Sequence, residues 1–168
     1  GIGNYAEDDI KAAARAFTGW TFTQPIPLYP YSTADSAFKF DDADHDAEEK
    51  VFLGQTVVNG EDVIDVIVQQ EACARFIARH LYNFFVADEP TVAQWPYKPP
   101  RDPEAIETLS RAYFESGYDI RAMLRVLFNS EFFRSEGSWY QKVKSPAELV
   151  AGTLRLSGEF GRPGIKIL

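Results

Sequence analysis

Apolar side chains recur every three to four positions through much of residues 61–129, which is the spacing of one buried face of an α-helix. Asp102 and Pro103 together form a typical helix start, an N-cap acceptor with proline at the first helical position. Gly117 supplies a left-handed end to that helix, and Asp119 caps the next one. The pattern therefore predicts helices from residue 61 to 68, over about 71–86, over 103–117 and from 119 to about 129.

Two more helices are predicted nearer the ends of the chain. Residues 7–18 open with three acids, which the helix dipole favours in a first turn, and Gly19 stops the helix. The run Ser145-Pro146-Ala147-Glu148 is a capping box with proline at the first helical position. It opens a helix that we expect to end at about residue 157.

Polar and apolar residues alternate in two places, which indicates short strands. Phe38 and Phe40 flank a polar residue, and residues 51–58 hold two short apolar runs. We predict that these strands pair as a hairpin whose loop is the acidic segment between them. Residues 21–37 and 87–102 are rich in proline and lack a helical period, so we expect irregular loops there.

The predicted fold class is mainly α, with five to six helices in a single domain over residues 1–168 and one short β-hairpin insert near residues 38–58. The first residues resemble the middle of a protein, and we expect the chain to be part of a larger one. No apolar run approaches the roughly 18 residues of a membrane span, so we expect no transmembrane segment.

Aromatic residues and charge distinguish an otherwise ordinary composition. Phe, Tyr and Trp make up 14% of the chain, enough for a well-packed core with rings left over for a binding surface. The net charge of −8 disfavours a nucleic-acid partner. Residues 1–49 hold 10 acids and 3 bases, whereas residues 119–168 hold 5 acids and 8 bases. We therefore expect the basic C-terminal end to bind the acidic N-terminal end or another anionic partner. The single Cys73 excludes an internal disulfide.

The acidic segment between the predicted strands packs six carboxylates and a histidine into residues 41–49. Asp42, Asp44 and Asp46 have the spacing of the first three calcium ligands of an EF-hand, but Ala47 stands where that loop needs glycine and Leu53 where it needs glutamate. The EF-hand interpretation therefore fails. A looser divalent-cation site at Asp44 and Asp46 stays open beside a solvated loop, and we expect no other cofactor.

His45 next to Asp46 is the candidate for acid–base chemistry, because neighbouring carboxylates favour the cationic imidazole. Sequence neighbours in an extended loop point in different directions, so a structural role is the alternative. The other histidine, His80, falls beside the apolar face of its predicted helix, where a ring usually bonds a backbone carbonyl.

Four residues are candidates for binding a ligand. Arg75 and Arg79 lie one turn apart on a predicted helix, as an anion clamp or as a surface ion-pair ladder. Trp95 and Tyr97 lie in a proline-rich loop, a common way to present rings to a sugar or a protein. Burial of these rings under the loop itself is the alternative.

Six ordered blocks of the sequence resemble one bacterial family, called domain of unknown function 1800, in its C-terminal half. The blocks lie within residues 4–20, 40–54, 74–86, 116–121, 130–133 and 142–146. Members are larger bacterial proteins, often predicted to be exported, without an established activity. The resemblance implies a periplasmic or extracellular location, with a cytoplasmic one left open. The resemblance places His45, Asp46 and Lys50 in a recurrent block of the family, which makes them the catalytic candidates. It also indicates that Ala6 stands where the family has a hydroxyl residue as the N-cap.

Two functions remain open from the sequence. The first is a binding or assembly module of an exported or envelope system that engages a protein or glycan. The alternative is half of a hydrolase site, with His45 as general acid or base, Asp46 orienting it and a divalent cation nearby. Whether the protein is an enzyme therefore stays undecided at this stage.

Overall fold

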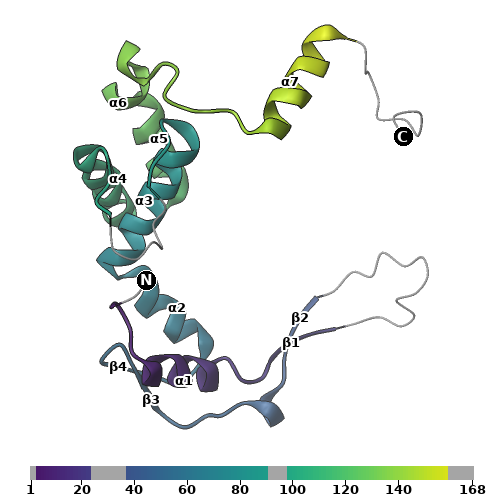
Figure 1. Ribbon diagram of the computed structural model, residues 1–168. Helices are drawn as coiled ribbons and strands as arrows, with labels where there is room; N and C mark the ends of the chain where they lie inside the picture. Colours follow the sequence, from purple (N-terminus) through teal and green to yellow (C-terminus); the bar gives the residue numbers. More distant parts are fainter. Residues whose placement is uncertain (1–2, 24–36, 91–97, 159–168) are drawn as a thin grey trace.

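The computed structural model describes residues 3–23, 37–90 and 98–158 (Figure 1). The elements follow in the order α1 (Glu7–Ala16), β1 (Trp20–Thr23), β2 (Ala37–Phe40), β3 (Lys50–Phe52), β4 (Gln55–Val57), α2 (Gly60–Val68), α3 (Glu71–Phe85), α4 (Pro103–Glu115), α5 (Ile120–Asn129), α6 (Glu131–Arg134) and α7 (Pro146–Ser157). The described residues thus hold seven α-helices and two short strand pairs, which confirms the mainly α prediction. Two 3₁₀ turns complete them, η1 (Asp42–Asp44) and η2 (Glu136–Ser138).

The β-hairpin predicted near residues 38–58 is confirmed by β3 and β4, but its strands are not the pair that was expected. β2 pairs with β1, so that Trp20 lies opposite Phe40, and β3 pairs with β4. The prediction that residues 38–40 pair with residues 51–58 is therefore wrong. The physical reason is the tight turn at Leu53 and Gly54, whose positive φ angles of 48° and 77° close β3 and β4 on each other.

Helix starts agree with the predicted caps. The Asp102 carboxylate accepts from the Ala105 amide at 3.0 Å, and the Ser145 hydroxyl accepts from the Glu148 amide at 3.3 Å. The short helix α6 was not predicted, because four residues are too few to show a helical period. In the described residues, no helix is long and apolar enough to cross a membrane.

Among the residues that the structure describes, two separate clusters of apolar side chains form the core. The larger one joins α3, α4 and α5, in the upper half of Figure 1, and its bulkiest fully buried side chains are Leu109, Tyr113, Met123 and Leu127. The smaller one joins α1, β3, β4 and α2, in the lower half, and consists of Ala12, Ala16, Phe52, Val57, Val63 and Val66. We call residues 3–68 the N-terminal part and residues 71–134 the helical part.

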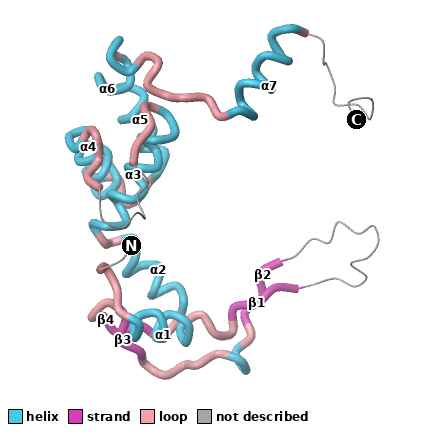
Figure 2. Tube along the Cα trace, in the orientation of Figure 1, coloured by secondary structure: helices cyan, strands magenta, loops and turns pink. Residues whose placement is uncertain are grey.

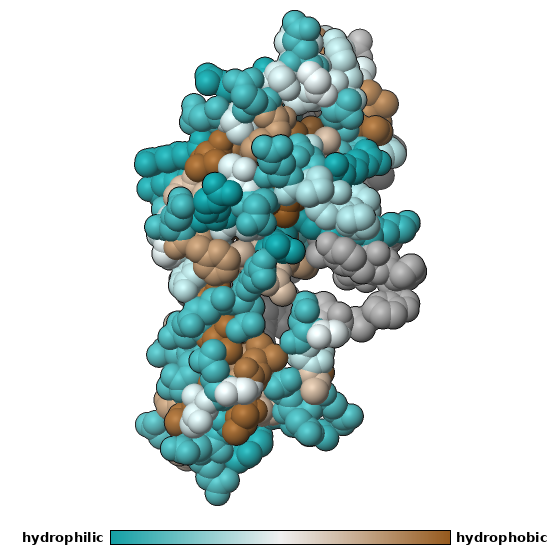
Figure 3. Space-filling view, turned by 90° about the vertical axis from the view of Figure 1, so that its left-hand side faces the viewer, coloured by the Kyte–Doolittle hydropathy of each residue, from teal (hydrophilic) through white to brown (hydrophobic). Residues whose placement is uncertain are grey.

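Two elements project from these clusters. The β1–β2 ribbon extends from the N-terminal part, and α7 stands at the end of an extended connection from the helical part (Figure 2). Apolar residues also reach the surface over both parts, as brown areas on the face drawn in Figure 3. Much apolar surface is therefore left uncovered.

Candidate functional site

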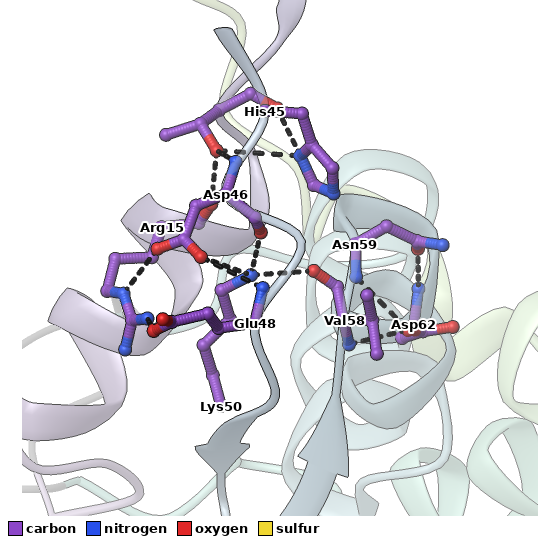
Figure 4. Close-up of polar contacts among 9 residues, drawn as sticks. Arg15, His45, Asp46, Glu48, Lys50, Val58, Asn59 and Asp62 are labelled. Carbon is purple, nitrogen blue, oxygen red and sulfur yellow. Dashed lines mark hydrogen bonds and ion pairs between the residues drawn. The ribbon is translucent and has the colours of Figure 1, made fainter. Parts of the chain in front are cut away.

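The chain after α1 packs closely against the segment between β2 and β3. The Asp41 amide donates to the Gly19 carbonyl at 2.8 Å. Gly19 has a φ of 81°, and a Cβ atom there would lie 2.7 Å from the Asp41 carbonyl oxygen and 3.0 Å from the His45 Cβ. Only glycine fits both the left-handed backbone and this close approach. The packing brings the acidic segment to the end of α1, where the candidate residues gather (Figure 4).

Thr18 fixes the orientation of His45. The His45 Nδ1 lies 2.9 Å from the Thr18 carbonyl oxygen, and the Asp46 amide donates to the Thr18 hydroxyl at 2.8 Å. Because a carbonyl oxygen only accepts, Nδ1 carries the proton, and Nε2 holds the lone pair of the neutral ring. The half-buried ring also packs 5.2 Å from the ring of Phe40.

The Asp46 carboxylate faces Arg15 (Figure 4). Its Oδ2 accepts from Arg15 Nε at 2.7 Å, and its Oδ1 accepts from the Glu48 amide at 3.0 Å. The Arg15 hydrogen bond, followed by the Glu48 amide, lowers the pKa of Asp46 from 3.8 to about 2. None of the hydrogen bonds described for this carboxylate goes to His45, so Asp46 is not placed to orient that ring.

Lys50 is buried at the start of β3, with only 1% of its side chain exposed. Its Nζ donates to the carbonyl oxygens of Asp46 and Val58, the latter at 2.9 Å, and lies 3.5 Å from the Asp46 Oδ1. A buried ammonium needs such partners, because burial without them costs several kcal/mol. Lys50 therefore ties the acidic segment to the end of β4.

Asp62 completes this polar network at the start of α2 (Figure 4). Its carboxylate accepts from the amides of Val58 and Asn59 at 2.8 and 3.1 Å, and these bonds lower its pKa. The Asn59 side chain accepts from the Asp62 amide at 2.9 Å, so both halves of a capping box are present. Most of the polar side chains in this network thus bond backbone groups, which is the arrangement of a structural scaffold.

In the part of the chain that the structure describes, no larger group of carboxylates surrounds the predicted cation site at Asp44 and Asp46. Asp44 is exposed in η1, and Asp46 is engaged by Arg15. In residues 3–23, 37–90 and 98–158, no three His, Cys, Asp or Glu side chains gather into a group that could hold a metal ion. The cation site at Asp44 and Asp46 stays a prediction.

The structure separates the two arginines suggested for ligand binding. Arg79 is 3% exposed, and its guanidinium donates to the carbonyl oxygens of Lys98 at 3.1 Å and Pro90 at 2.8 Å. It also lies 3.4 Å from the buried Glu89 carboxylate, so it holds together the two described ends of the loop. Arg75 is exposed and pairs with Glu71 at 2.7 Å. Trp95 and Tyr97 lie outside the described residues.

The remaining predicted candidate, His80, bonds its own helix. Its Nδ1 lies 2.9 Å from the Phe76 carbonyl oxygen, and the two rings lie 4.2 Å apart. The predicted backbone bond is confirmed, although the ring is exposed rather than at a buried face. Cys73 is half-buried, with its Sγ 3.7 Å from the Tyr113 hydroxyl.

Sequence reasoning missed an aromatic surface on the β1–β2 ribbon. Directly opposed residues of an antiparallel pair share a face, and so do residues two apart on one strand. The register pairs Trp20 with Phe40 and Phe22 with Phe38, so all four rings share one face, which we call the aromatic face. Phe22 is 59% exposed and Phe38 is 65% exposed. The alternation of aromatic residues at 20 and 22, and again at 38 and 40, is the signal that pointed to it.

The aromatic face is anchored at one end only. The Trp20 ring packs edge-on at 5.0 Å from Phe17, which lies against the smaller apolar cluster, and at 5.2 Å from Phe38. β1 ends at Thr23, and this end of the ribbon extends from the molecule (Figure 1). The ribbon therefore presents its rings outward from a fixed base.

A family model described as "Protein of unknown function (DUF1800)" matches residues 1–166. No curated protein and no solved structure matches the chain. The match covers nearly all of the chain, and its description carries no activity.

Proposed function

Since the chain belongs to the DUF1800 family of proteins of unknown function, we propose that it is a non-catalytic binding or assembly module that engages a protein or glycan partner. The observation that carries this proposal is the uncovered aromatic face of the β1–β2 ribbon. Contiguous exposed apolar surface marks an interaction site in soluble proteins. Aromatic rings also dominate the energetics of protein interfaces and stack on sugar rings.

The energetics favour an occupied aromatic face. Covering a Phe side chain contributes about 1.5–3 kcal/mol, and both Phe22 and Phe38 are more than half exposed. A two-stranded ribbon is only marginally stable in water by itself, and a partner that covers one face stabilises it. A partner thus supplies the apolar cover that stabilises the ribbon and that the described residues do not provide.

The polar network beneath the ribbon supports this role. Lys50 bonds two backbone carbonyls, and His45 bonds a third. These contacts fix the segment that follows β2, and with it the base of the ribbon. We assign the cluster of His45, Asp46 and Lys50 to positioning the aromatic face.

The proposal is tested with the full chain and a variant of the aromatic face, Phe22→Ser with Phe38→Ser. The matched control is Thr21→Ala with Lys39→Ala, on the opposite face of the same ribbon. We expect the wild type and the control to bind bacterial envelope fractions or glycans on an array. The aromatic variant should bind at least about ten-fold more weakly. Equal binding by all three proteins, or no binding by the wild type to these partners or to a second copy of the chain, would reject the proposal.

We also propose that the module works in an exported system, in the periplasm or at the cell surface. The resemblance described from the sequence supports this location. Fractionation of bacteria that express the full-length protein is the direct test, and recovery in the cytoplasmic fraction alone would exclude the proposed location.

A second candidate function is half of a hydrolase site built on His45. The supporting observation is the Thr18 carbonyl, which holds Nδ1–H and leaves Nε2 as the nitrogen that accepts a proton, as a general base requires. In this form of the hypothesis Thr18, rather than Asp46, orients the ring.

The two histidines allow a matched test of this second candidate. His45→Ala in the full-length protein should abolish its phenotype and any bound metal, whereas His80→Ala should leave both unchanged. Identical behaviour of the wild type and the His45 variant would remove the candidate.

A further inference from the structure

Helix α7 is formed but buries none of its side chains. All of its residues, Pro146–Ser157, are exposed or half-buried, including Leu149 at 58% and Leu156 at 90% exposure. An isolated helix of about 12 residues is marginal in water, because most helix stability in proteins comes from packing. A helix as well capped as this one, with a capping box at Ser145 and a left-handed Gly158, is therefore expected to pack on a surface.

The sequence of α7 is typical of a helix whose surface is buried against another element. Its only charged residues, Glu148 and Arg155, are seven positions apart and so lie on the same side. Most of the remaining circumference is apolar and consists of Ala147, Leu149, Val150, Ala151, Leu154 and Leu156. A helix that is apolar over most of its surface is normally buried.

Two hydrogen bonds from the segment before α7 to Asp88, which we call the tether, keep α7 away from the ribbon of its own chain. The Asp88 carboxylate accepts from Lys142 Nζ at 3.0 Å and from the Val143 amide at 3.1 Å. Only Lys144 and Ser145 separate Val143 from the helix, so α7 begins within about 11 Å of the tether. That point lies toward the end of the molecule opposite the ribbon (Figures 1 and 2). While the tether holds, α7 does not lie on the β1–β2 ribbon of its own copy.

We propose that the surface that covers α7 belongs to a second copy of the chain, and that two copies exchange α7 helices. Each helix then lays its apolar side on the aromatic face of the other copy's β1–β2 ribbon. This inference rests on the proposed function, since it makes the aromatic face a receptor for a partner and names that partner. A reciprocal exchange forms two identical junctions and closes on itself, which is the usual symmetry of a dimer.

Charge complementarity favours this partner. Lys142 is held by Asp88, but Lys144 and Arg155 give residues 143–158 two bases against one acid. Residues 37–49, at the base of the ribbon, carry six acids, of which Asp41, Asp46 and Glu48 pair with Lys39 and Arg15. Opposite charges at the rim of an interface steer association and fix its orientation. An α7 that approaches a second copy therefore meets an acidic rim around an apolar surface.

The test uses the full chain and two double variants. The ribbon variant is Phe22→Ser with Phe38→Ser, and the helix variant is Leu149→Ser with Leu156→Ser. All four side chains are more than half exposed, so the substitutions leave the core of each copy intact. The control is Glu148→Gln with Arg155→Gln on the polar side of α7, where glutamine still serves the capping box.

Sedimentation equilibrium should give twice the 18.9 kDa chain mass for the wild type and the control. Each double variant alone should sediment as a monomer. A tagged ribbon variant should nevertheless capture an untagged helix variant, because that pair keeps one intact junction. Neither variant should capture an untagged copy of itself.

Three outcomes would overturn the exchange. A ribbon variant that still dimerises would mean that helices pair with helices, and a helix variant that still dimerises would mean that ribbons pair with ribbons. A wild type that stays monomeric while it binds envelope fractions or glycans through the aromatic face would show that a different partner covers the ribbon. In that last case the proposed function survives and the exchange does not.

Discussion

The N-terminal and helical parts of this chain are held together in different ways. The core cluster of the helical part has eleven buried apolar residues, with Leu109, Tyr113, Met123 and Leu127 at its centre. The N-terminal part has six, of which two are alanines, and adds a buried lysine and a set of carboxylates bonded to backbone amides. The helical part also has the buried Arg79–Glu89 pair at its loop, but its centre depends on apolar volume. The smaller N-terminal part depends more on charged groups that fix its loops.

This difference bears on function. A part that carries a partner-binding ribbon needs its loops in one geometry, and hydrogen bonds are directional where apolar contacts are not. The polar network of Lys50, Asp46 and Asp62 therefore suits the base of a binding element. Substitutions and pH should therefore act differently on the two parts.

The largest effect is expected from Leu109→Ala in the helical part. Leu109 is fully buried, and loss of such a side chain costs about 3 kcal/mol in the free energy of unfolding. Chemical denaturation measures this loss, and hydrogen exchange should show it across α3, α4 and α5. The matched control is Leu156→Ala in α7, where the side chain is 90% exposed and a monomer should change by less than about 0.5 kcal/mol.

Lys50→Met should reduce the stability of the N-terminal part by about 2 kcal/mol, because two backbone carbonyls lose their buried donor. Hydrogen exchange in β3 and β4 should rise, while α3 to α5 keep their protection. Lys39→Met is the control, since Lys39 is exposed and pairs with Asp41 at the surface. Equal effects of the two substitutions would contradict a structural role for Lys50.

Acid should loosen the N-terminal part before the helical core. The pKa of Asp46 is lowered to about 2 by Arg15, so its contribution is complete above pH 3.8 and disappears as pH falls through about 2. Asp9 and Asp62 also have lowered pKa values, each from backbone amides. Hydrogen exchange between pH 4 and pH 2 should show α1 and β3 losing protection first. Asp46→Asn should weaken this dependence on pH, and an unchanged profile would count against the Asp46–Arg15 pair.

The helices were predictable because their signals are local. Asp102, Asp119 and Ser145 each accept a backbone amide at a helix start, as their sequence context indicated. The pairing of β1 with β2 was not predictable, because it joins Trp20 to Phe40 across a long proline-rich segment. Leu53 before Gly54 is also an unusual pair for a two-residue turn, which more often begins with Asn or Asp.

The candidate site was predictable only in part. The sequence marked His45, Asp46 and Lys50, and the structure brings them into one network. Their main partners, Thr18 and Arg15, lie about thirty positions earlier in the chain, and no local pattern connects them. Burial of Lys50 was equally hidden, because lysine is usually exposed.

The smallest effect is expected from Ala6→Ser at the start of α1. Ala6 has the extended backbone of an N-cap, and its amide already donates to the Asp9 carboxylate at 2.7 Å. A serine hydroxyl adds the missing acceptor for the amide of Asp9 and should stabilise the helix by about 0.5–1 kcal/mol. Ala14→Ser, at an exposed position within α1, is the control and should be neutral or slightly destabilising. If Ala6→Ser raises protection in α3 to α5 as much as in α1, the two parts unfold as one unit, and the difference between them lies in their contacts alone.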